Sequence, residues 1–121
     1  MLQIRPERAE DLPAVHSLYV RAFPTEAEAE AVDKLRARGA YLLSLVADFD
    51  GAVVGHIFFT PVTIEEDGAF FDVVGLAPMA VQPELQRRGI GSLLVRAGLE
   101  ALKQLGFAAV IVLGHAEYYP R

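Results

Sequence analysis

The sequence feature that most constrains the fold is an abrupt change of pattern between Val81 and Ile90. The residues before it, "AFFDVVGLAPMAV", are rich in the β-branched and aromatic side chains that strands favour. After Pro83, apolar residues recur at helical spacing, at Ile90, Leu94, Ala97, Ala101 and Leu105. "FAAVIVLG" then follows as a continuous apolar run, which is typical of a buried parallel strand. A strand, a long helix and a second strand in this order predict one βαβ crossover.

The residues before this unit predict a mixed α+β arrangement within one small domain of 121 residues. "LQIRP" is typical of a short strand, and two helices follow, the first with Asp11 as N-cap. Ala27, Ala31 and Leu35 continue the helical pattern through a second helix, which ends near Gly39. "DFDG" and "EEDG" have turn chemistry and separate three strands that pair in antiparallel order. Pro78 in the last of these strands predicts a bulge.

Composition excludes several classes of function. The formal net charge of -5 argues against nucleic-acid binding, which needs a basic surface. The absence of cysteine excludes disulfides and Cys-based zinc sites, and the three histidines do not have metal-ligand spacing, so no metal is expected. No apolar run reaches the ~20 residues that span a bilayer. We therefore expect a soluble cytoplasmic protein without membrane contact.

"QRRGIG" lies where the strand pattern gives way to the helix pattern. Glycine permits unusual backbone angles and close approach of a ligand, and the first N–H groups of a helix have no partner within the helix. Gln86, Arg87 and Arg88 add donors and positive charge. Together these features predict a phosphate or pyrophosphate site.

Two nucleotide-binding motifs were compared with this stretch. No Walker string G-x-x-x-x-G-K-[ST] occurs in the chain. The dinucleotide fingerprint G-x-G-x-x-G is incomplete, because Leu94 stands where its third glycine belongs. A nucleotide-dependent oxidoreductase domain remains as an alternative, and it predicts binding of NAD instead of coenzyme A.

The longer stretch "LAPMAVQPELQRRGIGSLLVRAGLEALKQLGF" closely resembles the acetyl-CoA-binding motif of the GCN5-related N-acetyltransferases (GNAT). "VVGHIFFTPV" and "GLAPMAV" look most like a predicted-acyltransferase branch of that superfamily. The order of elements also fits: strand, two helices, three antiparallel strands, signature helix, strand. The resemblance implies a GNAT fold and an enzyme that moves an acetyl group from acetyl-CoA to an amine by direct attack in a ternary complex.

The resemblance also implies roles for individual residues. The pyrophosphate of coenzyme A would be held by the loop formed by Gln86, Arg87, Arg88, Gly89, Ile90, Gly91 and Ser92. The pantetheine arm would pair with the backbone of Met79, Ala80 and Val81. The leaving thiolate would be protonated by Tyr119, with Tyr118 as second candidate, unless both rings simply pack under the sheet. His56 is the candidate base, with Asp72 as a weaker one; the alternative for His56 is a hydrogen-bonded core residue.

The chain departs from the family pattern after these tyrosines. Family members continue into a further helix and two more strands, whereas this sequence stops at Arg121. The strand at residues 108–113 would then have an open edge, which favours pairing with another copy as a homodimer. Three explanations follow: a fragment of a longer protein, strands supplied by a second copy, or a short non-catalytic descendant. The alternative function is therefore a CoA-binding or regulatory module without turnover. The acceptor, a small-molecule or peptide amine, is not identified by the sequence.

Overall fold

A computed structural model of the chain describes the backbone of residues 1–106 and 110–112, and side chains within these ranges except 64, 71, 72, 77 and 110–112. The helices and strands follow the predicted order. The strands are β1 (Leu2–Pro6), β2 (Leu43–Phe49), β3 (Ala52–Glu66), β4 (Ala69–Val81) and β5 (Val110–Val112). The helices are α1 (Leu12–Ala22), α2 (Ala27–Ala37) and α3 (Ile90–Gln104), with short 3-10 turns η1 (Ala9–Asp11) and η2 (Pro83–Leu85).

The described strands form one five-stranded sheet in the order β1-β2-β3-β4-β5. The first four strands pair antiparallel, and β5 pairs parallel to β4 after the α3 crossover. The two hairpins turn where the sequence predicts, since Asp50–Gly51 and Asp67–Gly68 all have positive φ. This confirms the α+β prediction with its mixed sheet.

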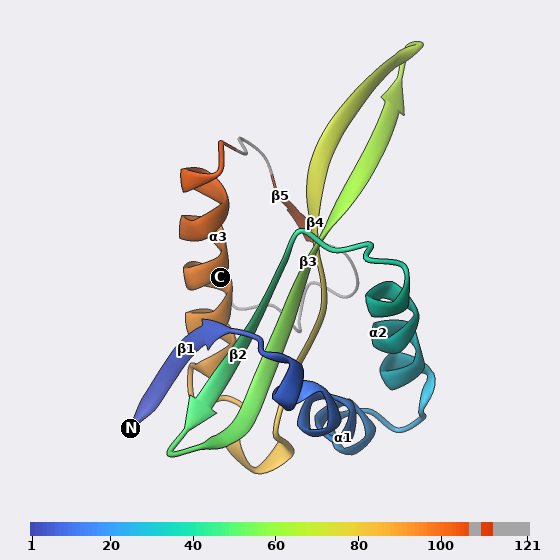
Figure 1. Cartoon of the computed structure of the whole chain (residues 1–121). Coiled ribbons are helices and arrows are strands. Elements are labelled where there is room, and N and C mark those ends of the chain that lie inside the picture. Colours follow the sequence, from blue (N-terminus) through green and yellow to red (C-terminus); the bar gives the residue numbers. More distant parts are fainter. Residues whose placement is uncertain (107–109, 113–121) are drawn as a thin grey trace.

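Helices cover both faces of the sheet. Figure 1 shows α3 on one side and α1 and α2 on the other. The α3 side packs Ile90, Leu94 and Leu102 onto sheet residues such as Ile57 and Phe59. Each of the two faces therefore has its own hydrophobic core, and β3 and β4 lie between them.

Helix α2 shows that the spacing of apolar residues alone does not define the buried face of a helix. The predicted helix is present, and its buried residues are Ala29 and Val32, whereas Ala27 and Ala31 are exposed and Leu35 is half-buried. Alanine and glutamate alternate at the start of this helix, and alanine adds little apolar area to either face, so the sequence favours neither side strongly. Packing against α1 and β3 decides which side is buried.

The fourth strand changes its register at the predicted bulge. Ile57 pairs with Met79, but Phe59 pairs with Leu76, so two β4 residues, 77 and Pro78, oppose one β3 residue. In Figure 1 the hairpin of β3 and β4 projects beyond the rest of the sheet, and β5 lies beside the middle of β4. No helix within the described residues is long and apolar enough to cross a membrane.

Candidate functional site

The connection from β4 to α3 is a tight loop in which the backbone is left-handed twice. Arg87 has φ of 65° and Gly89 has φ of 85°. Gly89 is the N-cap of α3 and has no side-chain capping bond. Its chain neighbours apart, no atom of the described residues lies within 4 Å of the place where a Cβ would be. A glycine suits this position because an L side chain is strained at such angles. The loop therefore leaves open space directly in front of the helix N-terminus.

The start of α3 offers hydrogen-bond donors to this space. The first bond of the helix runs from the Leu93 N–H to the Gly89 carbonyl at 3.1 Å. The N–H groups of residues 90–92 come earlier and have no acceptor within the helix. The helix dipole adds partial positive charge there, and Arg87 and Arg88 are exposed beside it. This arrangement suits an anionic group such as a phosphate.

Some side chains of the loop contact the rest of the fold, and others are exposed to solvent. Gln86 donates from Nε2 to the Val81 carbonyl at 3.1 Å and so ties the loop to the end of β4. Ile90 is buried in the α3-side core. Arg88 lines a small apolar cavity of about 190 Å³ with Leu85 and Ile90. The backbone, more than any side chain, is what this loop presents.

The end of β4 adjoins the loop and has a free edge within the described part of the chain. The described residues of β5 pair with β4 at residues 74, 75 and 76. Beyond the bulge, Met79, Ala80 and Val81 pair with β3 on one side, and no described strand pairs with them on the other. A strand edge of this kind can hydrogen-bond an extended ligand. The structure thus brings together the two backbone segments that the sequence predicts to bind the cofactor.

His56 lies on β3 and is fully buried. Its Nδ1 is 2.8 Å from the Tyr19 hydroxyl and its Nε2 is 2.9 Å from the Ser44 hydroxyl. Burial, and next the positive charge of Arg36, lower the pKa of His56 from 6.5 to about 3. The imidazole is therefore neutral at physiological pH and has no solvent-exposed surface. This is the arrangement of a hydrogen-bonded core residue, the alternative interpretation; the role of His56 as a base stays a prediction.

The remaining predicted residues lie outside the described part. Tyr118 and Tyr119 belong to the range 113–121, which the structure does not describe. The side chain of Asp72 is also outside the described part. Their roles stay predictions. Among the residues that the structure describes, no group of three or more His, Asp or Glu side chains could hold a metal ion.

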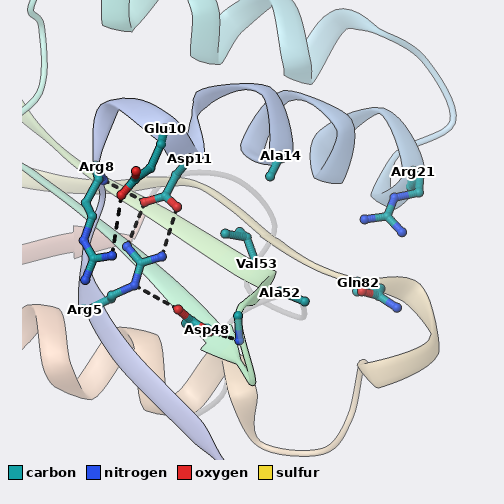
Figure 2. A pocket seen from close by; sticks show the side chains of 11 residues that line it. Arg5, Arg8, Glu10, Asp11, Ala14, Arg21, Asp48, Ala52, Val53 and Gln82 are labelled. Atoms are coloured by element: carbon teal, nitrogen blue, oxygen red, sulfur yellow. Dashed lines mark hydrogen bonds and ion pairs between the residues drawn. The ribbon is translucent and has the colours of Figure 1, made fainter.

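A cavity of about 610 Å³ lies between the start of α1 and the β2–β3 turn, and Figure 2 shows its charged lining. The buried Arg5 donates to Asp11 at 2.8 and 2.9 Å and to Asp48 at 3.1 Å. The Arg5 hydrogen bond lowers the pKa of Asp11, and the Gly51 N–H, followed by Arg5, lowers that of Asp48. This cluster joins β1, the start of α1 and the β2–β3 turn, so its charged groups pair with one another and stabilise the fold.

Asp11 occupies the predicted N-cap position of α1, but its carboxylate makes no capping bond to that helix. Instead it accepts the Arg8 N–H at 2.7 Å and the guanidinium of Arg5. The sequence offered no local signal for this cluster, because its members come from three separate elements.

A main-chain anion site at the start of a crossover helix, next to a strand with a free edge, is typical of proteins that bind a phosphorylated extended ligand. The comparison with known protein families identifies the family to which this chain belongs. The model of the acetyltransferase (GNAT) family matches residues 12–119, so the chain belongs to this family of N-acetyltransferases.

Individual relatives agree with the assignment. The chain is 40% identical over 119 residues to the uncharacterized N-acetyltransferase YhbS of Escherichia coli K12, covering 98% of this chain and 70% of the relative. A Brucella melitensis GNAT acetyltransferase, solved with acetyl-CoA, has a TM-score of 0.86 at 40% identity, covering 98% of this chain and 79% of that one. The structure of E. coli YhbS with CoA gives a TM-score of 0.85 at 39% identity, covering 93% of this chain and 62% of the other.

Proposed function

We propose that this protein binds acetyl-CoA through the β4 edge and the β4–α3 loop and transfers the acetyl group to an amine. The observation that carries the proposal is the open, left-handed Gly89 N-cap next to the edge of Met79–Val81, with which no second strand pairs among the residues that the structure describes. Both segments fit the ligand: the loop offers N–H groups to a pyrophosphate, and the edge offers backbone groups to the amides of a pantetheine arm. The complexes of the two similar proteins with acetyl-CoA and CoA support the same ligand.

In this proposal the bound acetyl-CoA supplies a thioester whose carbonyl carbon is attacked by the amine in a ternary complex. A backbone N–H within Met79–Val81 would donate to the carbonyl oxygen and stabilise the negative charge that develops there. An alkylammonium acceptor, with a pKa of about 10, must lose a proton before it attacks. Tyr119, with Tyr118 as second candidate, would donate a proton to the thiolate that leaves.

The proposal also covers the acceptor, the domain organisation, the compartment and the oligomeric state. The acceptor is a small-molecule or peptide amine, and the chain acts as one domain over residues 1–121 in the cytoplasm. Assembly as a homodimer belongs to the same proposal. Each of these points rests on the family membership and on the sequence.

Acetyl-CoA binding tests the site directly. Calorimetry with the wild type should show micromolar binding, and the Gly89→Glu, Gly91→Glu double variant should abolish it by placing two carboxylates where the phosphates bind. The control is Gly39→Glu, Gly106→Glu, since both of these glycines have positive φ and open space around them, at other places in the fold. A wild type that binds no acetyl-CoA, or a loop variant that binds as well as the control, would refute the proposed site.

Turnover can be followed through the thiol released from coenzyme A. Because the chain contains no cysteine, a thiol reagent has no background from the protein. With a panel of amines, Tyr119→Phe and Tyr118→Phe should lower turnover while acetyl-CoA affinity is kept. If the double phenylalanine variant keeps its full rate, the assignment of the acid is wrong. If the wild type binds but turns over no amine, the alternative of a CoA-binding module is favoured.

A further inference from the structure

A buried polar network lies on the α1 and α2 side of the sheet, centred on His56. The Tyr19 hydroxyl of α1 lies 2.8 Å from Nδ1 of the imidazole, and the Ser44 hydroxyl of β2 lies 2.9 Å from its Nε2. The rings of Tyr19 and His56 also meet edge to face, with centroids 5.5 Å apart. All three side chains are buried, so a helix and two strands are joined by bonds that solvent does not reach.

An ion pair next to the imidazole assigns its tautomer. The Glu7 carboxylate lies 3.5 Å from Nε2 and is itself held by both guanidinium nitrogens of Arg36. A nearby carboxylate favours the proton on the ring nitrogen that faces it. Nε2 therefore carries the hydrogen and donates to Ser44, and Nδ1 accepts the hydroxyl hydrogen of Tyr19. A hydrogen bond from Tyr19 thus connects α1 to β3.

This connection lies directly behind the proposed donor site. His56 is the register partner of Ala80 across the β3–β4 ladder. Ala80 is 4% exposed and belongs to the same core cluster as Tyr19, Val46 and Phe58. An alanine side chain fills little space, so the position of this part of β4 depends on what packs behind it. The tyrosine on α1, oriented by His56, is part of that backing.

We propose that His56 is a positioning residue for the acyl donor. By orienting Tyr19 it holds α1 against the back of Ala80, and so fixes the β4 edge at which the pantetheine arm binds. The inference rests on the proposed function of that edge. Ligand sites lose affinity when their supporting residues leave them loose by about an ångström, and backbone hydrogen bonds to an extended ligand depend on the same geometry. His56 acts here through Tyr19 and Ala80, without touching the ligand.

The amide variants of His56 separate this role from direct proton transfer. Asparagine places its oxygen near the Nδ1 position and keeps an acceptor for Tyr19, whereas glutamine places its nitrogen near Nε2 and does not. We expect His56→Gln and Tyr19→Phe to weaken acetyl-CoA binding by about tenfold, the equivalent of one lost hydrogen bond. His56→Asn should stay within about threefold of the wild type, because a change of about 0.6 kcal/mol corresponds to that ratio.

Calorimetry must be performed where every variant is folded, with unfolding curves recorded in parallel. Leu102→Ala is the control, since Leu102 is also buried but belongs to the α3-side core, which includes neither Ala80 nor the hydrogen bonds of His56. It should lower stability and leave affinity unchanged. If His56→Gln and Tyr19→Phe bind like the wild type and lose only stability, the positioning role is refuted and the proposed function stands. If the wild type itself binds no acetyl-CoA, the proposed function fails, and the inference fails with it.

Discussion

Mild acid should destabilise this protein through His56. Burial, followed by the charge of Arg36, lowers the pKa of the folded imidazole to about 3, whereas the unfolded chain titrates near 6.5. Between these values the unfolded state binds more protons, so the free energy of unfolding falls as the pH falls. The contribution is fully present above pH 6.5 and decreases by up to about 1.4 kcal/mol per pH unit below it. Between pH 7 and pH 5 the loss from this one group is about 2 kcal/mol.

Urea unfolding at pH 7, 6 and 5 measures this loss, with the non-titrating His56→Gln variant beside the wild type. The variant should be less stable at pH 7 but should lose about 2 kcal/mol less than the wild type between pH 7 and pH 5. Asp11 and Asp48 do not obscure the window, because their lowered pKa values place their effect below the unfolded value of 3.8. His16→Gln is the control, removing an imidazole whose side chain is 45% exposed. Equal losses in the wild type and His56→Gln would refute the reasoning.

Three further predictions concern packing and ion pairs. Gly98→Ala should lower stability by roughly 1–3 kcal/mol in thermal unfolding, because its Cβ would lie 2.1 Å from the Phe59 ring; an unchanged melting temperature would contradict this close packing. Asp11→Asn should cost about 2 kcal/mol in urea unfolding, since it leaves the buried Arg5 with one carboxylate instead of two; a wild-type midpoint would show that the pair contributes nothing. Arg36→Met should speed hydrogen exchange across α2 by removing the ion pair that ties this helix to the segment after β1, and unchanged protection of α2 would argue that apolar contacts alone hold it.

Local signals explain which parts of the fold could be predicted from the sequence. The strand at Leu2–Pro6, the turns at Gly51 and Gly68 and the bulge at Pro78 each depend on residues next to one another in the chain. Glycine at positive φ and proline in a strand restrict the backbone whatever the rest of the protein does. The parallel pairing of β5 with β4 also followed, because a βαβ crossover permits few other arrangements.

Contacts between distant residues could not be predicted in the same way. The partners of His56 come from positions 19 and 44, and Arg5 meets carboxylates at positions 11 and 48. No spacing rule joins such residues, because they meet only when the sheet and helices have assembled. For the same reason the sequence alone did not indicate which face of α2 is buried. A histidine on a strand looks the same in sequence whether it faces a substrate or a core.

The proposed site depends partly on local signals in the sequence and partly on contacts between distant residues. Its two parts, the loop before α3 and the edge of β4, consist of main-chain groups. Their geometry could be predicted from the sequence because glycine and proline restrict the backbone in characteristic ways. What fixes these parts in space is not local: the Gln86 side chain bonds to Val81, and the face behind Ala80 is formed by α1. A backbone site transmits every displacement of its supports to the ligand, because no flexible side chain lies between them to absorb it. Substitutions behind β4, such as those at Tyr19, should therefore change donor affinity although they never contact the donor.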